Sequence, residues 1–109
     1  MEERINMLIQ FVAKHHVFDE NKYPELKDAT PDEIVRFAIK HSALHFSKAA
    51  GKVATVSESV DHGGDIDAEE LKKNISKTIV NALRLAEVIG MTGEDIIQRI
   101  EKQYSDKLE

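Results

Sequence analysis

The fold is decided by residues 30–64, which read TPDEIVRFAIKHSALHFSKAAGKVATVSESVDHGG. Thr30-Pro31-Asp32-Glu33 supplies a hydroxyl N-cap, a proline at the first helical position and a glutamate three residues after the cap. This combination is a capping box, which marks the start of a helix. No strong break follows until His62-Gly63-Gly64, so the segment predicts one helix of about 30 residues, about 45 Å long. Gly51 lies inside it at a cost of about 1 kcal/mol against alanine, so we expect another backbone to pass close to Gly51.

A second long helix is expected after the turn. Gly63 and Gly64 permit the positive φ angles of a tight turn, and Asp65 or Asp67 is then placed to cap a helix over residues 68–89. The apolar positions of this helix form a stripe too wide for one neighbouring helix to cover. They are Leu71, Ile75, Ile79, Ala82, Leu83, Ala86 and Ile89. We therefore predict a long central antiparallel hairpin of two helices.

Two shorter helices flank this hairpin. Residues 3–15 place apolar side chains at spacings of three and four, which predicts an amphipathic helix. Tyr23-Pro24 disfavours helix within residues 17–29, which we expect to form a loop. Thr92-Gly93-Glu94-Asp95 caps a fourth helix. Its buried side would hold Ile96, Ile97, Ile100 and Tyr104. The whole chain, residues 1–109, is expected to be a single all-α domain, a bundle of about four helices.

Composition narrows the classes of protein. The chain has 109 residues, 41% of them hydrophobic and 32% charged, which suits one globular domain. It has no cysteine and no apolar run near the ~20 residues that a membrane span needs, so we expect a cytoplasmic protein without a membrane partner. The formal charge of -5 and the absence of a basic run argue against nucleic acid as a partner.

Two stretches match the motifs of a known family. Residues 48–53 read Lys-Ala-Ala-Gly-Lys-Val, and residues 74–77 read Asn-Ile-Ser-Lys before the chain runs on into Leu-Arg-Leu-Ala-Glu-Val-Ile-Gly at 83–90. These motifs and their separation resemble the helical core of the MazG-like all-α NTP pyrophosphohydrolases, whose pattern reads Glu-Glu-Ala-Gly-Glu-Leu, then Glu-Leu-Ala-Asp. The resemblance covers residues 30–104. It implies a helical hairpin whose two acidic clusters hold Mg²⁺ for hydrolysis of a nucleoside triphosphate to release pyrophosphate.

The metal ligands of that family are replaced in this chain. The resemblance puts the family's carboxylates at Lys48, Ala49, Lys52, Asn74 and Lys77. Mg²⁺ is a hard cation that prefers oxygen ligands, and a protonated lysine cannot ligate it. We therefore expect no catalytic residue here and no standard pyrophosphohydrolase activity.

The replacements themselves point to a different ligand. Helical spacing puts His41, His45, Lys48 and Lys52 on one face, and Asn74, Lys77 and Asn81 on the facing helix. Lysines and amides gathered in this way would hold a phosphate group without a metal cofactor. The alternative is a solvated groove with no ligand, because charged runs on helices usually decorate a surface.

Two metal sites are alternatives to the phosphate site. His41 and His45 are four residues apart, a spacing able to start a zinc site, although no cysteine or adjoining glutamate completes it. The tip of the hairpin is acidic, and Glu58, Asp61 and Glu70 would provide relocated Mg²⁺ ligands. Capping and the helix dipole also explain these acids.

We arrive at three functional hypotheses. The first is a catalytically degenerate MazG-like protein that binds a nucleotide or phosphate without metal. The second is an active Mg²⁺-dependent pyrophosphohydrolase with relocated carboxylates, and the third is a structural or regulatory helical partner. The apolar excess on both long helices leads us to expect a homo-oligomer in each case, a dimer or a dimer of dimers.

Overall fold

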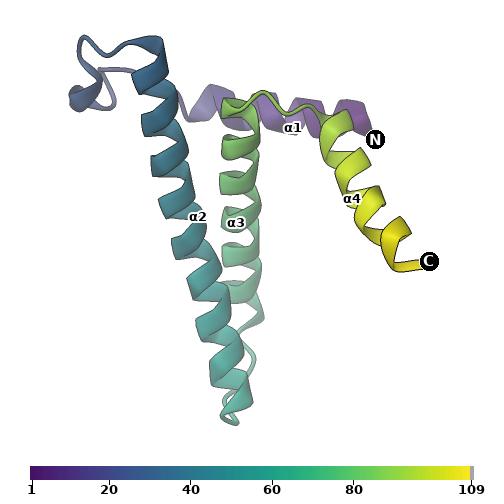
Figure 1. The fold of residues 1–109 in the computed structure, drawn as a ribbon. Coiled ribbons are helices and arrows are strands. Elements are labelled where there is room, and N and C mark those ends of the chain that lie inside the picture. The colour runs from purple at the N-terminus through teal and green to yellow at the C-terminus, as the bar shows by residue number, and fades with distance from the viewer. Residues whose placement is uncertain (109) are drawn as a thin grey trace.

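The structure is a computed structural model that describes residues 1–108. Its elements are α1 (Glu2–His15), the 3₁₀ helix η1 (Pro24–Leu26), α2 (Pro31–Asp61), α3 (Ala68–Val88) and α4 (Gly93–Leu108). The prediction of an all-α chain with four helices is confirmed for the described residues. Figure 1 shows α2 and α3 side by side, with α1 crossing near the C-terminal end of α3. α4 packs on α1 and lies apart from α2.

The ends of α2 follow the predicted signals. Thr30 Oγ1 accepts a hydrogen bond from Glu33 N at 3.2 Å, and Thr30 N donates to Glu33 Oε1 at 3.1 Å, so both halves of the capping box form. The helix runs 31 residues to Asp61. Gly63 then adopts a φ of 83°, a left-handed conformation that glycine adopts without the steric cost of a Cβ atom. The reversal of the chain between α2 and α3 therefore depends on this glycine.

α3 is capped by a side chain from the turn. Asp67 Oδ1 accepts from Glu70 N at 3.1 Å, as expected for an acidic N-cap. Gly90 follows the C-terminal end of α3 with a φ of 78°. These signals fix the span of α3 and therefore the register of its side chains against α2.

The buried core lies between α1, α3 and α4 and is small. Ile9 and Val12 of α1 pack against Leu83 of α3, and Ile5, Val80 and Ile96 surround them. Gly93 begins α4 against α1, where Gly93 N donates to Asn6 Oδ1 at 2.7 Å. A Cβ atom at Gly93 would lie 2.5 Å from Glu2 O, so this close approach requires glycine.

Aromatic rings hold the segment between α1 and α2. Phe18 stacks on Tyr23 with ring centroids 5.4 Å apart, and both rings meet Phe37 of α2 edge-on, Phe18 at 6.1 Å and Tyr23 at 5.1 Å. Leu26 of η1 is buried. The predicted loop over residues 17–29 is therefore wrong in part, because η1 and the rings give this segment its own packing.

Two further packing expectations, at Gly51 and on α4, were wrong, and part of the α3 stripe is exposed within the single chain. Gly51 has no atom within 4 Å of a Cβ position, so no backbone approaches it. Ile75 and Ile79 of the expected apolar stripe are 44% and 50% exposed, and Ile89 is also exposed. Ile100 and Tyr104 of α4 are exposed as well, although we expected them on its buried side. The main contacts among the described elements join α2 to α3, α1 to α3 and α1 to α4, so both long helices and α4 keep faces that the described chain does not cover.

The chain exposes more surface than its mass predicts. Its accessible surface is 8335 Å², whereas a compact monomer of 12.3 kDa would expose about 6,100 Å². Its radius of gyration is 16.8 Å, against about 13 Å for a compact domain of this length. Among the described residues no helix is both long and apolar enough to cross a membrane.

Candidate functional site

The α2 residues of the predicted phosphate site lie along one face of that helix. The rings of His41 and His45 are in contact, with centroids 4.5 Å apart, and both residues are half-buried. Tyr23 Oη and His41 Nε2 are 3.3 Å apart, so the segment before α2 contacts the site through this pair. Lys48 and Lys52 are exposed. The segment before α2 therefore encloses the end of this face at His41 and His45, whereas the end at Lys48 and Lys52 is open to solvent.

The three α3 residues of the predicted site differ in their exposure to solvent. Asn74 and Asn81 are buried, whereas Lys77 is exposed. Asn74 Nδ2 donates to Glu70 O at 2.8 Å and to Glu70 Oε1 at 3.1 Å, and Asn81 Nδ2 donates to Lys77 O at 2.8 Å. Both Nδ2 groups thus donate within α3, whereas the buried Oδ1 of Asn74 has no hydrogen-bond partner among the described residues. Of these three residues only Lys77 is exposed.

Arg84 is a buried cation beside the candidate site that the sequence analysis did not single out. It is only 7% exposed, and its Nη1 donates to Asn81 Oδ1 at 3.4 Å. Its guanidinium carbon lies 5.1 Å from the centre of the Phe18 ring. Its Nε is buried without a hydrogen-bond partner among the described residues. Spacing was the available signal, because Arg84 follows Lys77 by seven residues and therefore lies on the same face, two turns along α3.

The charges around Arg84 affect the neighbouring histidines. Burial lowers the pKa of His16 below its usual 6.5, and the positive charge of Arg84 lowers it further. Burial also lowers the pKa of His41, followed by the charges of His45 and Arg84. Both histidines are therefore neutral at neutral pH, and one buried guanidinium carries the charge of this enclosed region.

We name the basic face by its residues, which are His41, His45, Lys48 and Lys52 of α2 and Lys77 and Arg84 of α3. The ion pairs of the described residues join Arg36 to Asp32 and Lys72 to Glu69. No lysine or arginine of the basic face takes part in either pair. These cations therefore have no carboxylate within 4.0 Å in the described part of the chain, although its formal charge is -5.

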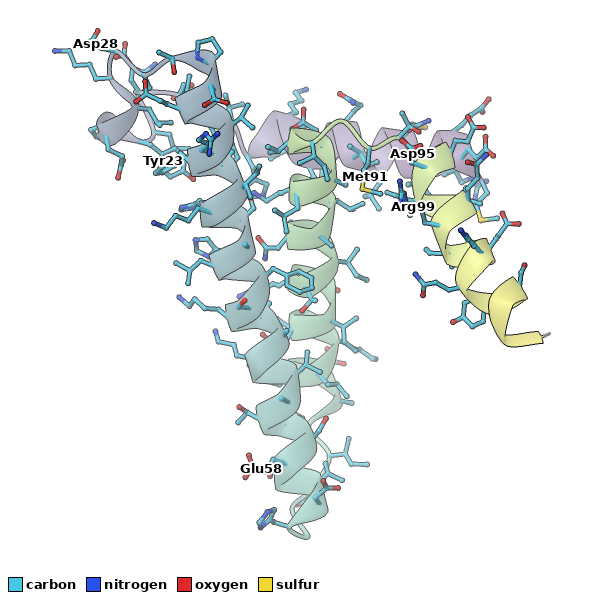
Figure 2. The ribbon with its side chains drawn as sticks, in the orientation of Figure 1. Tyr23, Asp28, Glu58, Met91, Asp95 and Arg99 are labelled. Atoms are coloured by element: carbon cyan, nitrogen blue, oxygen red, sulfur yellow. The ribbon has the colours of Figure 1, made fainter. Side chains whose placement is uncertain are left out.

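The acids of the relocated metal site do not gather. Glu58 and Asp61 are exposed near the end of α2, and Figure 2 shows Glu58 near the opposite end of that helix from Tyr23. Glu70 is half-buried in the first turn of α3 and accepts from Asn74. Within residues 1–105, whose side chains the structure describes, no three histidine, aspartate or glutamate side chains form a group that could hold a metal ion, and this includes the histidine pair.

The side of the α2–α3 pair away from the basic face is apolar. A groove of about 230 Å³ is lined by Ala50, Val53, Ile75, Thr78 and Ile79. Ile75 is two residues from Lys77, which puts the two side chains about 200° apart around the axis of α3. Phe46 and Lys48 are related in the same way on α2. We name this apolar face by Ile39, Phe46, Ala50 and Val53 of α2 and Ile75 and Ile79 of α3.

The α2–α3 pair thus offers two different surfaces, one basic and one apolar. The basic face has an enclosed end at Arg84 and an open end at Lys48, Lys52 and Lys77. The apolar face has no covering element in the described chain. Comparison with protein-family models, with curated proteins and with solved structures finds no match for this chain.

Proposed function

We propose that this chain is a non-catalytic, MazG-like helical protein that binds a phosphate-bearing ligand on its basic face without a divalent metal. The observation that carries the proposal is that Lys48, Lys52, Lys77 and Arg84 share this face with no carboxylate in ion-pair contact among the described residues. Cations gathered without an acid attract an anion, and charge-assisted hydrogen bonds to phosphate are about twice as strong as neutral ones. The resembled family has metal-binding carboxylates at the positions of Lys48, Lys52 and Lys77, on the two helices of an antiparallel hairpin.

The class of ligand follows from the spacing of the cations. Lys77 and Arg84 are two helical turns apart, so their Cα atoms are separated by about 10.5 Å along α3. A single phosphate group does not span this distance, whereas a nucleotide or a polyphosphate does. Lysines hold such ligands as point charges and do not require a fixed geometry, which suits the exposed positions of Lys48 and Lys77.

The test is titration calorimetry with a nucleoside triphosphate and with pyrophosphate in the presence of EDTA. Lys48→Ala and Lys77→Ala should each weaken binding about fivefold or more, because each removes one charged contact to phosphate. Lys102→Ala is the matched control, because Lys102 is an exposed lysine on α4 outside the basic face. An effect of Lys102→Ala equal to that of the two face variants would overturn the proposal, because binding would then follow net charge alone.

A different measurement distinguishes the proposed binding function from the alternative of an active pyrophosphohydrolase. An active pyrophosphohydrolase with relocated ligands would release pyrophosphate from nucleoside triphosphates with Mg²⁺ or Mn²⁺. We expect release at the background rate, because Glu58, Asp61 and Glu70 form no group of three that could hold a metal ion among the described residues. Turnover that Glu58→Gln or Glu70→Gln abolishes would establish the enzyme instead.

A second function, self-assembly, is favoured by the exposed surface. The chain exposes about 2,200 Å² more than a compact monomer of its mass would, and a standard interface needs only about 800 Å² from each partner. We propose that a second copy of this chain covers the apolar face, so that four long helices surround a shared core. The apolar groove at Val53, Ile75 and Ile79 supports this arrangement, because like surfaces meet in a two-fold dimer. A light-scattering mass of one chain at micromolar concentration would contradict it.

A further inference from the structure

Arg84 is a buried cation with almost no hydrogen bonding. It is 7% exposed, its one hydrogen bond among the described residues is the 3.4 Å contact from Nη1 to Asn81, and its buried Nε has no partner. Burying a charge is costly unless an opposite charge and hydrogen bonds compensate it. The Phe18 ring at 5.1 Å supplies a cation–π contact, which is weaker than an ion pair with full hydrogen bonding. The guanidinium therefore lacks the anion that such burial normally requires.

The groups that face Arg84 and its histidines are predominantly basic. α1 contributes His15 and its C-cap residue His16, and the following segment contributes Lys22, whose charge acts on both His16 and His41. α2 contributes His41 and His45, whose rings touch. Glu25 is the one acid whose charge acts on His41, and it forms no ion pair with Arg84. An anion at this position would therefore meet a region of positive potential.

We propose that Arg84, His16, His41 and His45 form a binding site for one phosphate group, the terminal phosphate of the ligand whose remainder contacts Lys48 and Lys77. This inference rests on the proposed function, because it assigns the enclosed end of the same basic face. Inorganic phosphate is the smallest ligand of this chemistry.

Phosphate fits the donors better than a carboxylate does. The guanidinium edge that includes Nε binds two oxygens of a planar or tetrahedral anion side by side. A carboxylate has no further oxygen for the imidazoles, whereas a phosphate has additional oxygens that accept from His16, His41 or His45. Its charge of about −2 at neutral pH also matches a site with one fixed cation and several protonatable rings.

The site is closed in the arrangement described here. Phe18 covers the guanidinium, and its ring stacks on Tyr23, whose hydroxyl contacts His41. Because Arg84 Nε is not accessible to solvent, entry of phosphate requires the segment that carries Phe18 to move. Binding should therefore alter the environment of the Tyr23 and His41 rings.

Binding at this site should take up protons. In the ligand-free chain, burial and the charge of Arg84 keep His16 and His41 neutral, with pKa values below 6.5. A phosphate dianion beside the rings favours their charged forms, so it raises both pKa values. Protonation of the rings therefore strengthens binding as pH falls from about 8 to about 6, whereas protonation of the phosphate to its monoanion over the same range opposes it, so the raised histidine pKa values are the specific signature of the site.

The experiment uses inorganic phosphate as the probe, with thermal unfolding, calorimetry and histidine NMR titrations on the full chain. Phosphate should raise the Tm of the wild type. Arg84→Gln should lose affinity for phosphate about tenfold or more. Arg36→Gln is the matched control, because Arg36 is exposed at the start of α2 and pairs with Asp32. It should bind phosphate as the wild type does.

The outcomes separate this site from the proposed function. If Lys48→Ala and Lys77→Ala weaken nucleotide binding while Arg84→Gln binds inorganic phosphate like the wild type, the Arg84 site is wrong and the function stands. If the lysine variants change nothing while Arg84→Gln abolishes phosphate binding, the Arg84 site stands and the lysine function is wrong.

Two measurements keep the test decisive if Arg84→Gln fails to fold. Arg84→Lys retains the charge but not the two-pronged guanidinium edge, so it should fold and bind phosphate more weakly than the wild type. In the wild type itself, phosphate should raise the pKa values of His16 and His41 in NMR titrations. Unchanged histidine pKa values at a phosphate concentration that saturates calorimetric binding would overturn the site.

Discussion

The guanidinium of Arg84 lies over the ring of Phe18, with its central carbon 5.1 Å from the ring centroid. This contact joins α3 to the segment between α1 and α2, which are distant in sequence. The Phe18 ring also covers Arg84, the one buried cation among the described residues. The stability of this region should therefore depend on the aromatic ring.

Phe18→Leu tests that dependence. Leucine retains apolar volume but removes the cation–π contact and the ring stacking on Tyr23, so we expect a loss of about 1–2 kcal/mol in the free energy of unfolding. Urea denaturation measures it. Phe11→Leu on α1 is the matched control, because Phe11 is 63% exposed, and it should change stability by less than about 0.5 kcal/mol. Equal effects of the two substitutions would show that the Arg84 contact contributes nothing.

Two glycine-to-alanine substitutions should have opposite signs. A Cβ atom at Gly93 would lie 2.5 Å from Glu2 O, so Gly93→Ala must displace α4 from α1 and should destabilise by about 1–3 kcal/mol. Gly51→Ala meets no atom within 4 Å in the middle of α2 and should stabilise by about 0.5–1 kcal/mol. Thermal unfolding of both variants checks the pair. Destabilisation by Gly51→Ala would show that another chain passes close to this position.

Local signals predicted the helices well. The capping box at Thr30, the turn glycine Gly63 and the N-cap at Asp67 each act within a few residues, and the structure contains all of them, whereas Gly64 does not adopt a positive φ. The wide stripe on α3 was a poorer guide to packing, because apolar spacing shows that a face must be covered and not what covers it. Ile75 and Ile79 are exposed because α2 covers them only in part, at the groove with Ala50 and Val53, and no further described element covers the rest.

The candidate site was predicted only in part, for a related reason. Helical periodicity placed Lys48, Lys52 and Lys77 at exposed positions of the basic face. It could not show that Asn74 and Asn81 bond to carbonyls of their own helix, because that depends on side-chain conformation. Nor could it find Arg84, whose burial depends on the aromatic packing of Phe18.

A charge introduced on the apolar face should block self-assembly. Ile79→Lys places an ammonium group in the groove that we assign to a second copy, so we expect the light-scattering mass to fall to that of one chain. Leu44→Lys is the matched control, because Leu44 is also exposed but lies more than half a turn of α2 away from Phe46. It should leave the mass unchanged. Loss of assembly in Leu44→Lys alone would move the interface to that side.

Acid should destabilise the fold through His16 and His41. Burial and then neighbouring positive charges lower both pKa values in the folded chain, so the unfolded chain binds protons more tightly. By linkage, this contribution to stability is complete above about pH 6.5 and is lost as pH falls below it. Urea unfolding at about pH 7.5 and about pH 5.5 should show this decrease in the wild type.

His16→Gln should reduce that pH dependence, because glutamine does not titrate. His62→Gln is the control, since His62 is exposed beyond the far end of α2, and it should keep the dependence of the wild type. The attribution to His16 would be wrong if His16→Gln and the wild type lost stability equally between the two pH values.

The central claim is that cations of the protein replace the metal in holding phosphate. Titration calorimetry with pyrophosphate, in EDTA and then in excess Mg²⁺, tests it most directly. We predict binding in EDTA and weaker binding with Mg²⁺, because the metal competes with Lys48, Lys77 and Arg84 for the same phosphate oxygens. Binding that requires Mg²⁺ and survives both Lys48→Ala and Lys77→Ala would contradict the claim.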